Sequence, residues 1–354
     1  MISEEDLTKY NSSAKICGIV FREIVFKISN NEMLETNLLN EYGDRRILEE
    51  CSKIYKREDK NIAFPTSISL NDCVGNYIYQ ENSNDYNMIK NGDVVKIELG
   101  VNIGGCIAVL GETIIYNSQG NQHNNSQENS SDKDYNKYLD LLNELSLSIP
   151  KMIIPGGLND DVKIMIESKC TETGCFPVEN SISYQHIDGQ LVTDDSKYII
   201  TNYQKYYDDD DNLAVPENIC FEFEAGEVYT INLTVIPNDY EKDDETQHEY
   251  YEPHESHIYR FNDNYYSLKL KMSREFCSES KNKHNTNAFN CLPYKKNARW
   301  RVGIKECLDN NILDEYPIIY NKDKLPVFHK KFTLVVSDNK CFELKYQNAK
   351  KSKV

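Results

Sequence analysis

Two stretches near the start of the chain carry apolar residues at the spacing of amphipathic helices. Residues 14–28 place Ile16, Ile19, Val20 and Ile24 along one side of a helix. Residues 35–57 repeat the pattern, with apolar positions at Leu38, Leu39, Ile47, Leu48, Cys51 and Ile54. Because side chains three and four positions apart share one helix face, the pattern predicts two helices.

Strand-like patterns follow these helices and return near the end of the chain. Residues 92–116 form two runs rich in β-branched residues around Gly104 and Gly105, which predicts a β-hairpin. Residues 226–237 (GEVYTINLTVIP) predict a long strand, and residues 330–346 predict a second hairpin.

Helical spacing also recurs between these strands. Leu139, Leu142 and Leu145 predict a helix over 135–149 that ends at Pro150. Another helix is expected after Gly156 and Gly157, with Asn159 or Asp160 as its N-cap, and residues 297–313 predict a further helix.

The order of these elements predicts the domain organisation. Two helices and a hairpin are followed by two helices and a second hairpin, which favours one domain over residues 1–354 built from two similar halves. We expect an insertion at 238–325, a polar low-complexity loop at 117–134 and a short basic tail at 347–354.

Charge is distributed unevenly along the chain. The formal net charge of the 354 residues is -17, yet residues 265–354 hold 19 Lys and Arg against 9 Asp and Glu, a net of +10. The acidic whole argues against nucleic acid wrapping around the entire surface, whereas the segment suggests one basic face. The alternative is that these lysines only solvate the helices that carry them.

Composition excludes several other classes of protein. No apolar run approaches the roughly 20 residues needed to cross a bilayer, so we expect no membrane insertion. The acidic, polar start does not predict a secretory signal. The eleven cysteines include no C-x-x-C pair, and we expect reduced, mostly buried thiols.

Several ordered motifs resemble one family of proteins. The segments NIAFPTSISLNDCVGNY (61–77), GDVVKIELGVNIGGCIAVLGETII (92–115), FEAGEVYTINLTV (223–235) and HKKFTLVV (329–336) are similar to type 2 methionine aminopeptidases and their non-enzymatic relatives. Together with AR-x-x-VG-x-x-EC (298–307), they most resemble the proliferation-associated, ErbB-receptor-binding proteins. The resemblance implies an α+β pita-bread fold with two pseudo-symmetric halves, and it implies that 238–325 is a type 2 helical insertion.

The resemblance also implies where the metal ligands of the active enzymes would fall. The five ligand positions correspond to Glu98, Val109, Asn180, Asn232 and Lys331, and the position of a substrate-contacting His corresponds to Asn76. Valine offers no ligand atom, the two asparagines offer neutral amide oxygens, and a lysine ammonium repels a cation. We therefore expect no metal, no cofactor and no catalytic residue.

Lys331 and Glu98 suggest an alternative use of the old metal position. If both side chains point into the pocket, they can form an ion pair that ties the two halves together. The other possibility is that both point to solvent and never meet.

Three functions remain open at this point. The first is a non-enzymatic binding protein, for which the resemblance implies RNA, ribosomes or regulatory proteins as partners and the cytoplasm, with the nucleus or nucleolus, as its location. The second is an active metal-dependent methionine aminopeptidase, and the third is a histone-chaperone-like peptide binder. We expect a monomer.

The basic segment supplies the candidate contacts to nucleic acid. They are the lysines and arginines Lys269, Lys271, Arg274, Lys295, Lys296, Arg299, Arg301, Lys350, Lys351 and Lys353. Trp300 stands between two of these arginines and could stack on a base, although a single Trp on a helix more often packs into the core.

Overall fold

A computed structural model gives the fold of most of the chain. It describes residues 2–79, 87–118, 135–205, 207, 215–238, 250–251, 255–338, 341–344 and 346. The predicted basic tail at 347–354 lies outside these residues, as does the predicted polar loop at 117–134 except for its first two positions.

Helices and strands alternate along the described chain. The helices are α1 (Glu4–Ser29), α2 (Thr36–Ser52), α4 (Asn136–Met152), α5 (Asn159–Thr173), α6 (Lys271–His284), α7 (Leu292–Lys295) and α8 (Ala298–Asp309). The strands of the two halves are β1 (Lys60–Leu70), β2 (Val94–Ile103), β3 (Cys106–Ile115), β4 (Cys175–Pro177), β5 (Ser181–His186), β6 (Tyr198–Thr201), β7 (Val228–Pro237), β13 (Phe328–Val336) and β14 (Cys341–Glu343). Short strands accompany α6–α8: β8 (Tyr250–Tyr251), β9 (Ile258–Phe261), β10 (Phe289–Asn290), β11 (Leu313–Tyr316) and β12 (Tyr320–Asn321).

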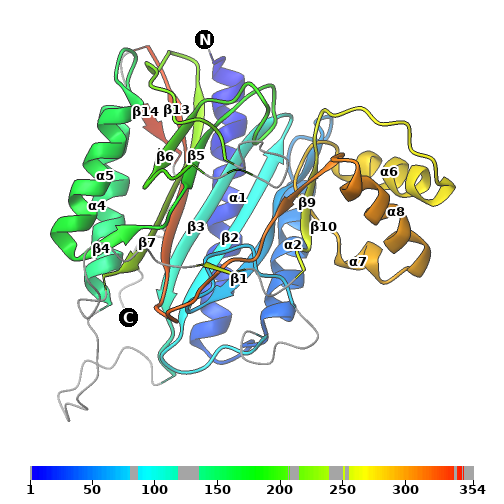
Figure 1. The fold of residues 1–354 in the computed structure, drawn as a ribbon, viewed down its shortest axis with the longest axis horizontal. Helices are drawn as coiled ribbons and strands as arrows, with labels where there is room; N and C mark the ends of the chain where they lie inside the picture. The colour runs from blue at the N-terminus through cyan, green and yellow to red at the C-terminus, as the bar shows by residue number, and fades with distance from the viewer. Residues whose placement is uncertain are drawn as a thin grey trace.

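One antiparallel sheet joins the two halves of the molecule. Its order is β1-β2-β3-β13-β7-β5-β6, so the first half contributes β1–β3 and the second half contributes β13, β7, β5 and β6. Helices α1 and α2 pack on the first half, and α4 and α5 pack on the second (Figure 1). The halves meet where β3 pairs with β13.

Alternation along the strands divides the sheet into an apolar face and a polar face. On β2, the residues packed against the helices are Val95, Ile97, Leu99, Val101 and Ile103. Successive strand residues point to opposite faces, so Lys96 and Glu98 lie on the other face, where both are buried. A buried polar face is unusual because charged side chains are rarely buried unless they are paired, and it locates the candidate site.

The segment with α6–α8 lies beside the first half (Figure 1), and its residues Ile258 and Ala288 pack in one cluster with Phe64 and Val109 of the sheet. The Ala288 amide donates a hydrogen bond of 3.1 Å to the Ala63 carbonyl, and Asn102 Nδ2 donates one of 2.9 Å to Asn287 Oδ1. These contacts attach the segment to the edge of the sheet at β1 and β2.

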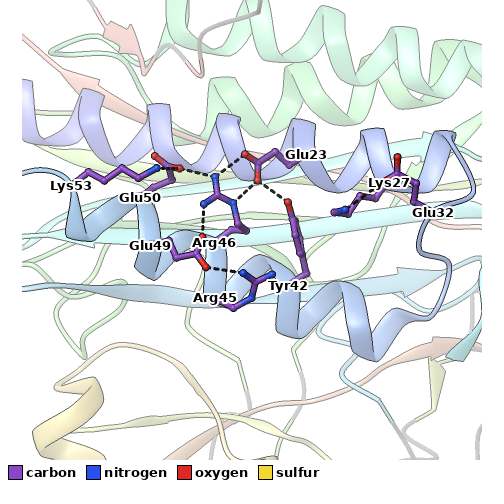
Figure 2. Close-up of polar contacts among 9 residues, drawn as sticks. All are labelled: Glu23, Lys27, Glu32, Tyr42, Arg45, Arg46, Glu49, Glu50 and Lys53. Carbon is purple, nitrogen blue, oxygen red and sulfur yellow. Dashed lines mark hydrogen bonds and ion pairs between the residues drawn. The ribbon is translucent and has the colours of Figure 1, made fainter.

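A charged network fastens α2 to α1. The guanidinium of Arg46 donates two hydrogen bonds to the carboxylate of Glu23, at 2.7 and 2.8 Å, and one each to Glu49 and Glu50, both at 2.6 Å (Figure 2). Tyr42 donates a further hydrogen bond of 3.0 Å to Glu23. Because Glu23 belongs to α1 and the other partners to α2, Arg46 fixes the contact between the two helices.

Two predicted helix boundaries differ from the structure. Helix α4 runs through Pro150 to Met152, so the proline does not end the helix as predicted, and only two helical residues follow it. The N-cap of α5 is Leu158, not Asn159 or Asp160. Asn159 instead accepts a hydrogen bond from the Phe221 amide and donates one to the Ile219 carbonyl, so a tertiary contact replaces the predicted cap.

Candidate functional site

Three of the five predicted ligand positions lie on one row across the sheet. Glu98 on β2 pairs with Gly111 on β3, Gly111 pairs with Lys331 on β13, and Lys331 pairs with Asn232 on β7. Residues paired across antiparallel strands point to the same face. Glu98, Lys331 and Asn232 therefore all lie on the polar face of the sheet.

Lys331 forms an ion pair with Glu98. Its Nζ atom lies 2.7 Å from Glu98 Oε1, with the Glu98 side chain 2% exposed and the Lys331 side chain 14% exposed. The ammonium also lies 5.7 Å from the centre of the Phe64 ring. This geometry confirms the predicted pair and shows that neither side chain points to open solvent.

Gly111 makes this pair possible, because it stands between the two residues in the row. A Cβ atom at Gly111 would meet the His329 ring and would lie 2.9 Å from Lys331 Cβ. Without a side chain on β3 at this point, the Lys331 side chain can reach across the strand to Glu98.

The remaining predicted positions have other local partners. Val109 is fully buried in an apolar cluster with Phe64 and Ile107. The side-chain oxygen of Asn232 accepts a hydrogen bond of 3.0 Å from Thr234 Oγ1, and the backbone amide of Asn232 donates one of 2.9 Å to Ser183 Oγ.

Asn180 and Asn76 both adopt positive φ, of 51° and 62°. Asn180 Oδ1 accepts a hydrogen bond of 2.8 Å from the Gln204 amide, which holds the turn before β5. Asn76 Nδ2 donates one of 3.0 Å to the Pro317 carbonyl. In the described structure, no hydrogen bond joins either residue to Glu98 or Lys331.

Sequence reasoning missed two buried basic groups next to the pair. Lys96 is 1% exposed and donates to the Asn71 carbonyl at 2.8 Å, and burial lowers the pKa of its ammonium to about 8. His329 is 3% exposed, and burial together with the charge of Lys331 holds its pKa well below the usual value. Strand alternation in the sequence marks only the apolar face of β2 and β13, so it does not show that the opposite face is buried as well.

A second ion pair crosses the same junction on the helix side of the sheet. Lys330 Nζ lies 2.5 Å from Glu112 Oε1 on β3 and 3.2 Å from Asn143 Oδ1 on α4. Since Lys330 and Lys331 are consecutive on a strand, they point to opposite faces. The adjacent lysines thus tie the two halves together from both sides, a role that was not predicted for Lys330.

The residues present do not fit the pair of divalent metals that the fold resemblance implies. Such a site needs several carboxylate or imidazole ligands around each ion. Here the carboxylate of Glu98 is bound to an ammonium, and the other four positions offer no anionic oxygen or imidazole. Among the residues that the structure describes, no group of three or more His, Cys, Asp or Glu side chains is placed to hold a metal ion.

A hydroxyl and imidazole chain occupies the neighbouring row. His186 Nε2 lies 2.8 Å from Thr230 Oγ1, which lies 3.1 Å from Thr333 Oγ1, and the Val109 amide donates to that hydroxyl at 2.9 Å. Burial lowers the pKa of His186 to about 3, so its ring is neutral. This series of hydrogen bonds crosses β5, β7, β13 and β3, so it also connects the two halves of the sheet.

The basic candidates fall into three groups. Lys269, Lys271, Arg274, Lys296, Arg299 and Arg301 are exposed on or beside α6–α8. Lys350, Lys351 and Lys353 lie outside the described residues. Lys295 is the exception, because it is 8% exposed.

The Lys295 ammonium forms an ion pair and hydrogen bonds inside the protein. Its ammonium lies 2.7 Å from Glu255 Oε1, 2.7 Å from the Ser256 carbonyl and 3.0 Å from the Tyr259 hydroxyl. In the short helix α7 its side chain points inward while that of Lys296 points out, a difference between adjacent residues that charge counting cannot detect. Trp300 is half-buried with its ring 5.4 Å from that of Tyr294, which agrees with core packing.

The thiols behave as composition predicted. All eleven cysteines lie in the described part of the chain and none forms a disulfide; nine are buried, Cys220 is exposed and Cys341 is partly exposed. No helix among the described residues has the length and apolar character needed to cross a membrane.

Known proteins resemble the chain along most of its length. ErbB-3 binding protein 1 of Arabidopsis thaliana is 28% identical over 347 residues, covering 96% of this chain and 80% of that protein. The curved DNA-binding protein of Schizosaccharomyces pombe is 26% identical over 349 residues, covering 95% of this chain and 84% of its own. No family model matches the sequence. The resemblance to the proliferation-associated, ErbB-receptor-binding proteins is therefore confirmed at the level of whole-chain similarity.

Solved structures confirm the fold. A thermophilic Arx1 superposes with a TM-score of 0.76 at 19% identity, covering 97% of this chain and 91% of that one. Methionine aminopeptidase from Thermotoga maritima superposes with a TM-score of 0.57 at 14% identity, covering 98% of both chains. The chain has the pita-bread fold of the methionine aminopeptidases.

Proposed function

We propose that this chain is a binding protein on an aminopeptidase-like fold and has no metal-dependent aminopeptidase activity. The observation that carries the proposal is the ion pair of 2.7 Å between Lys331 and Glu98. The resemblance assigns metal ligands to both positions, and here one of them supplies the positive charge itself.

Electrostatics explains why this pair and a metal exclude each other. A divalent cation at Glu98 would stand next to a buried ammonium, and repulsion between like charges is strong where water is excluded. Lys331 also satisfies the Glu98 carboxylate, which would otherwise be a buried and unpaired charge. Glu98 and Lys331 therefore have a structural role at this site and no catalytic one.

The second part of the proposal is that RNA, free or in a ribosome, binds the basic surface of α6–α8. We define this basic surface as Lys269, Lys271, Arg274, Lys296, Arg299 and Arg301, and we leave Lys295 out because it is buried. Residues 269–305 carry ten Lys and Arg against two Asp and Glu in a chain of net charge -17. An acidic body repels phosphate and so favours encounters at this surface.

The local geometry is consistent with a phosphate-binding surface. Lys296 and Arg301 line a cavity of about 930 Å³ between this segment and α2, together with Lys305. Arg299 lies 3.7 Å from Glu275, a loose contact that leaves its guanidinium available to a stronger anion. The name of the fission yeast relative, a curved DNA-binding protein, also points to nucleic acid.

Titration of labelled single-stranded RNAs of unrelated sequence tests this proposal. We expect binding that is similar for all sequences and that weakens steeply with salt, because phosphate contacts release counterions. Tighter binding to duplex DNA would replace RNA as the partner, and no salt-dependent binding to either would contradict the assignment. We further propose that the protein acts as a monomer in the cytoplasm and nucleus.

A further inference from the structure

Two cysteines meet where α6 packs against α8. Cys277 Sγ lies 3.4 Å from Cys307 Sγ. One turn earlier on each helix, Gly303 approaches α6 so closely that an added Cβ would lie 3.0 Å from Ser273 Cα and from the Met272 carbonyl. This close approach of the two backbones brings the thiols into contact in the native packing.

The two thiols differ in their access to solvent. Cys277 is 8% exposed and lines a surface cavity of about 380 Å³, together with Ser278 and Lys281. Cys307 is fully buried behind it. A small molecule that enters the cavity therefore reaches Cys277 first.

The pair also differs in acidity. The hydrogen-bond contact with the Cys307 thiol, in which either sulfur could donate, and the nearby charge of Lys281 lower the pKa of the Cys277 thiol. The same hydrogen bond and burial raise the pKa of Cys307. Because the thiolate is the nucleophile in thiol chemistry, Cys277 is the more reactive of the two.

We propose that Cys277 and Cys307 form an oxidisable dithiol, in which hydrogen peroxide first oxidises Cys277 and Cys307 then closes a disulfide. In the first step the Cys277 thiolate attacks one peroxide oxygen, the O–O bond breaks, and the leaving hydroxide takes a proton to become water. In the second step Cys307 sulfur attacks the Cys277 sulfenic acid and releases a second water. Two thiols and one hydrogen peroxide thus give one disulfide and two waters.

Closure requires little movement of the protein. The sulfur atoms must approach from 3.4 Å to the S–S bond length of about 2.05 Å. The disulfide would fix α6 to α8. Helix α6 carries Lys271 and Arg274, and helix α8 carries Arg299 and Arg301. Oxidation would thereby hold two rows of surface cations in one arrangement.

A second pair of cysteines provides a matched comparison. The thiols of Cys170 and Cys175 lie within hydrogen-bond reach of each other, Cys175 Sγ also donates to the Cys170 carbonyl at 3.4 Å, and both residues are at most 1% exposed. Since neither thiol is accessible to a dissolved oxidant, this pair should resist hydrogen peroxide in the folded protein. The comparison shows whether oxidation requires access of the oxidant to a thiol or only two thiols close together.

The test is treatment of the full chain with hydrogen peroxide, followed by alkylation of free thiols, digestion and mass spectrometry. We expect a linked pair of peptides containing Cys277 and Cys307, a loss of two hydrogens, and reversal by a thiol reductant. Cys307→Ser should leave a sulfenic acid on Cys277 that dimedone labels, whereas Cys170→Ser should still form the disulfide. Circular dichroism of each variant before oxidation establishes that it is folded.

The proposal is overturned if Cys277 and Cys307 both stay alkylatable while the exposed Cys220 is oxidised. It is equally overturned if wild-type Cys277 joins Cys291 instead of Cys307, or if Cys277→Ser forms the same amount of disulfide at Cys307.

Discussion

Lys331 on β13 and Glu98 on β2 form an ion pair of 2.7 Å across the intervening strand β3, at the point where β3 carries Gly111. The two residues are 233 positions apart in sequence and belong to different halves of the sheet. On the opposite face, Lys330 and Glu112 join the same halves. The junction between the halves is therefore held by two charge pairs of the protein itself.

Removing one partner of the buried pair should be costly. Lys331→Met leaves the Glu98 carboxylate, which is 2% exposed, without its counter-charge. We expect the free energy of unfolding to fall by about 3–5 kcal/mol, as measured by urea denaturation.

The double variant Lys331→Met/Glu98→Leu is the control for this prediction. Replacing both partners removes the uncompensated charge, so most of the lost stability should return. A single variant within about 1 kcal/mol of the wild type would show that the pair is not buried as described.

Gly111 should tolerate no side chain. Gly111→Ala places a Cβ against the His329 ring and 2.9 Å from Lys331 Cβ, so the strand or the ion pair must shift. We expect a loss of about 1–3 kcal/mol in the free energy of unfolding.

Gly75→Ala is a matched control for that variant. An added Cβ at Gly75 meets no atom within 4 Å. Its effect on the denaturation midpoint should be small. If Gly75→Ala lowers the stability as much as Gly111→Ala does, the steric explanation for Gly111 is wrong.

The sequence predicted the elements well and the buried charges poorly, for a physical reason. The apolar positions of α1, β2 and β13 recur with helix or strand period because one face of each packs on the core. Burial of the other face depends on residues far away in sequence, such as Ala288 against Ala63. Lys96 and His329 therefore look like ordinary surface residues in the sequence, although both are buried in the structure.

The pair Lys331–Glu98 could be predicted only because motifs identified the fold. By contrast, Arg46 stands among the acidic and basic residues of α2, and nothing in that stretch indicates that Glu23 on α1 is its partner. Lys295 and Lys296 illustrate the same limit, because a count of charges treats both as surface cations.

The network around Arg46 predicts a particular pH dependence. Arg46 hydrogen bonds lower the pKa of Glu23 and Glu49, and Lys53 with Arg46 lowers that of Glu50. Carboxylates with a lowered folded-state pKa stabilise the protein above their unfolded pKa, and this stabilisation is lost as the pH falls through the folded value. We expect Arg46→Met to cost about 1–2 kcal/mol at neutral pH, and to cost progressively less below about pH 4, as measured by denaturation at each pH.

Arg45→Met provides the comparison for Arg46. The Arg45 side chain is 60% exposed, forms an ion pair with Glu49 (Figure 2) and lies 5.3 Å from the centre of the Tyr42 ring. An exposed pair contributes about 0–1 kcal/mol, so this variant should stay close to the wild type. An Arg46→Met effect that is independent of pH would contradict the electrostatic account.

Charge reversal on the basic surface should weaken binding to RNA. We expect Lys296→Glu/Arg299→Glu/Arg301→Glu to reduce affinity for unrelated sequences alike, since backbone contacts carry no sequence information. If all three residues contact phosphate, the log–log salt slope on single strands should fall by about 2. Fluorescence anisotropy at low and moderate salt measures both quantities.

A reversal of the same size at the far end of the molecule is the control. Lys137, Lys151 and Lys163 lie on α4 and α5, away from α6–α8 (Figure 1). Changing these three to Glu alters the net charge equally but should leave the salt slope unchanged. If both triple variants lose the same amount of RNA affinity, the effect comes from overall charge. If neither loses affinity, the basic surface does not bind RNA and its charges are only solvated.

The central claim is that an ion pair occupies two of the positions that the sequence resemblance matches to metal ligands of methionine aminopeptidases, and peptide hydrolysis tests it most directly. The measurement is release of N-terminal Met from short peptides by the purified protein with added Mn²⁺, Co²⁺, Zn²⁺ or Fe²⁺, beside an active methionine aminopeptidase. We predict no turnover above the peptide and metal alone, because Val109, Asn180, Asn232 and Lys331 provide no anionic or imidazole ligand. Turnover within about a hundredfold of the active enzyme, a difference of only about 2.7 kcal/mol in barrier, would contradict the account.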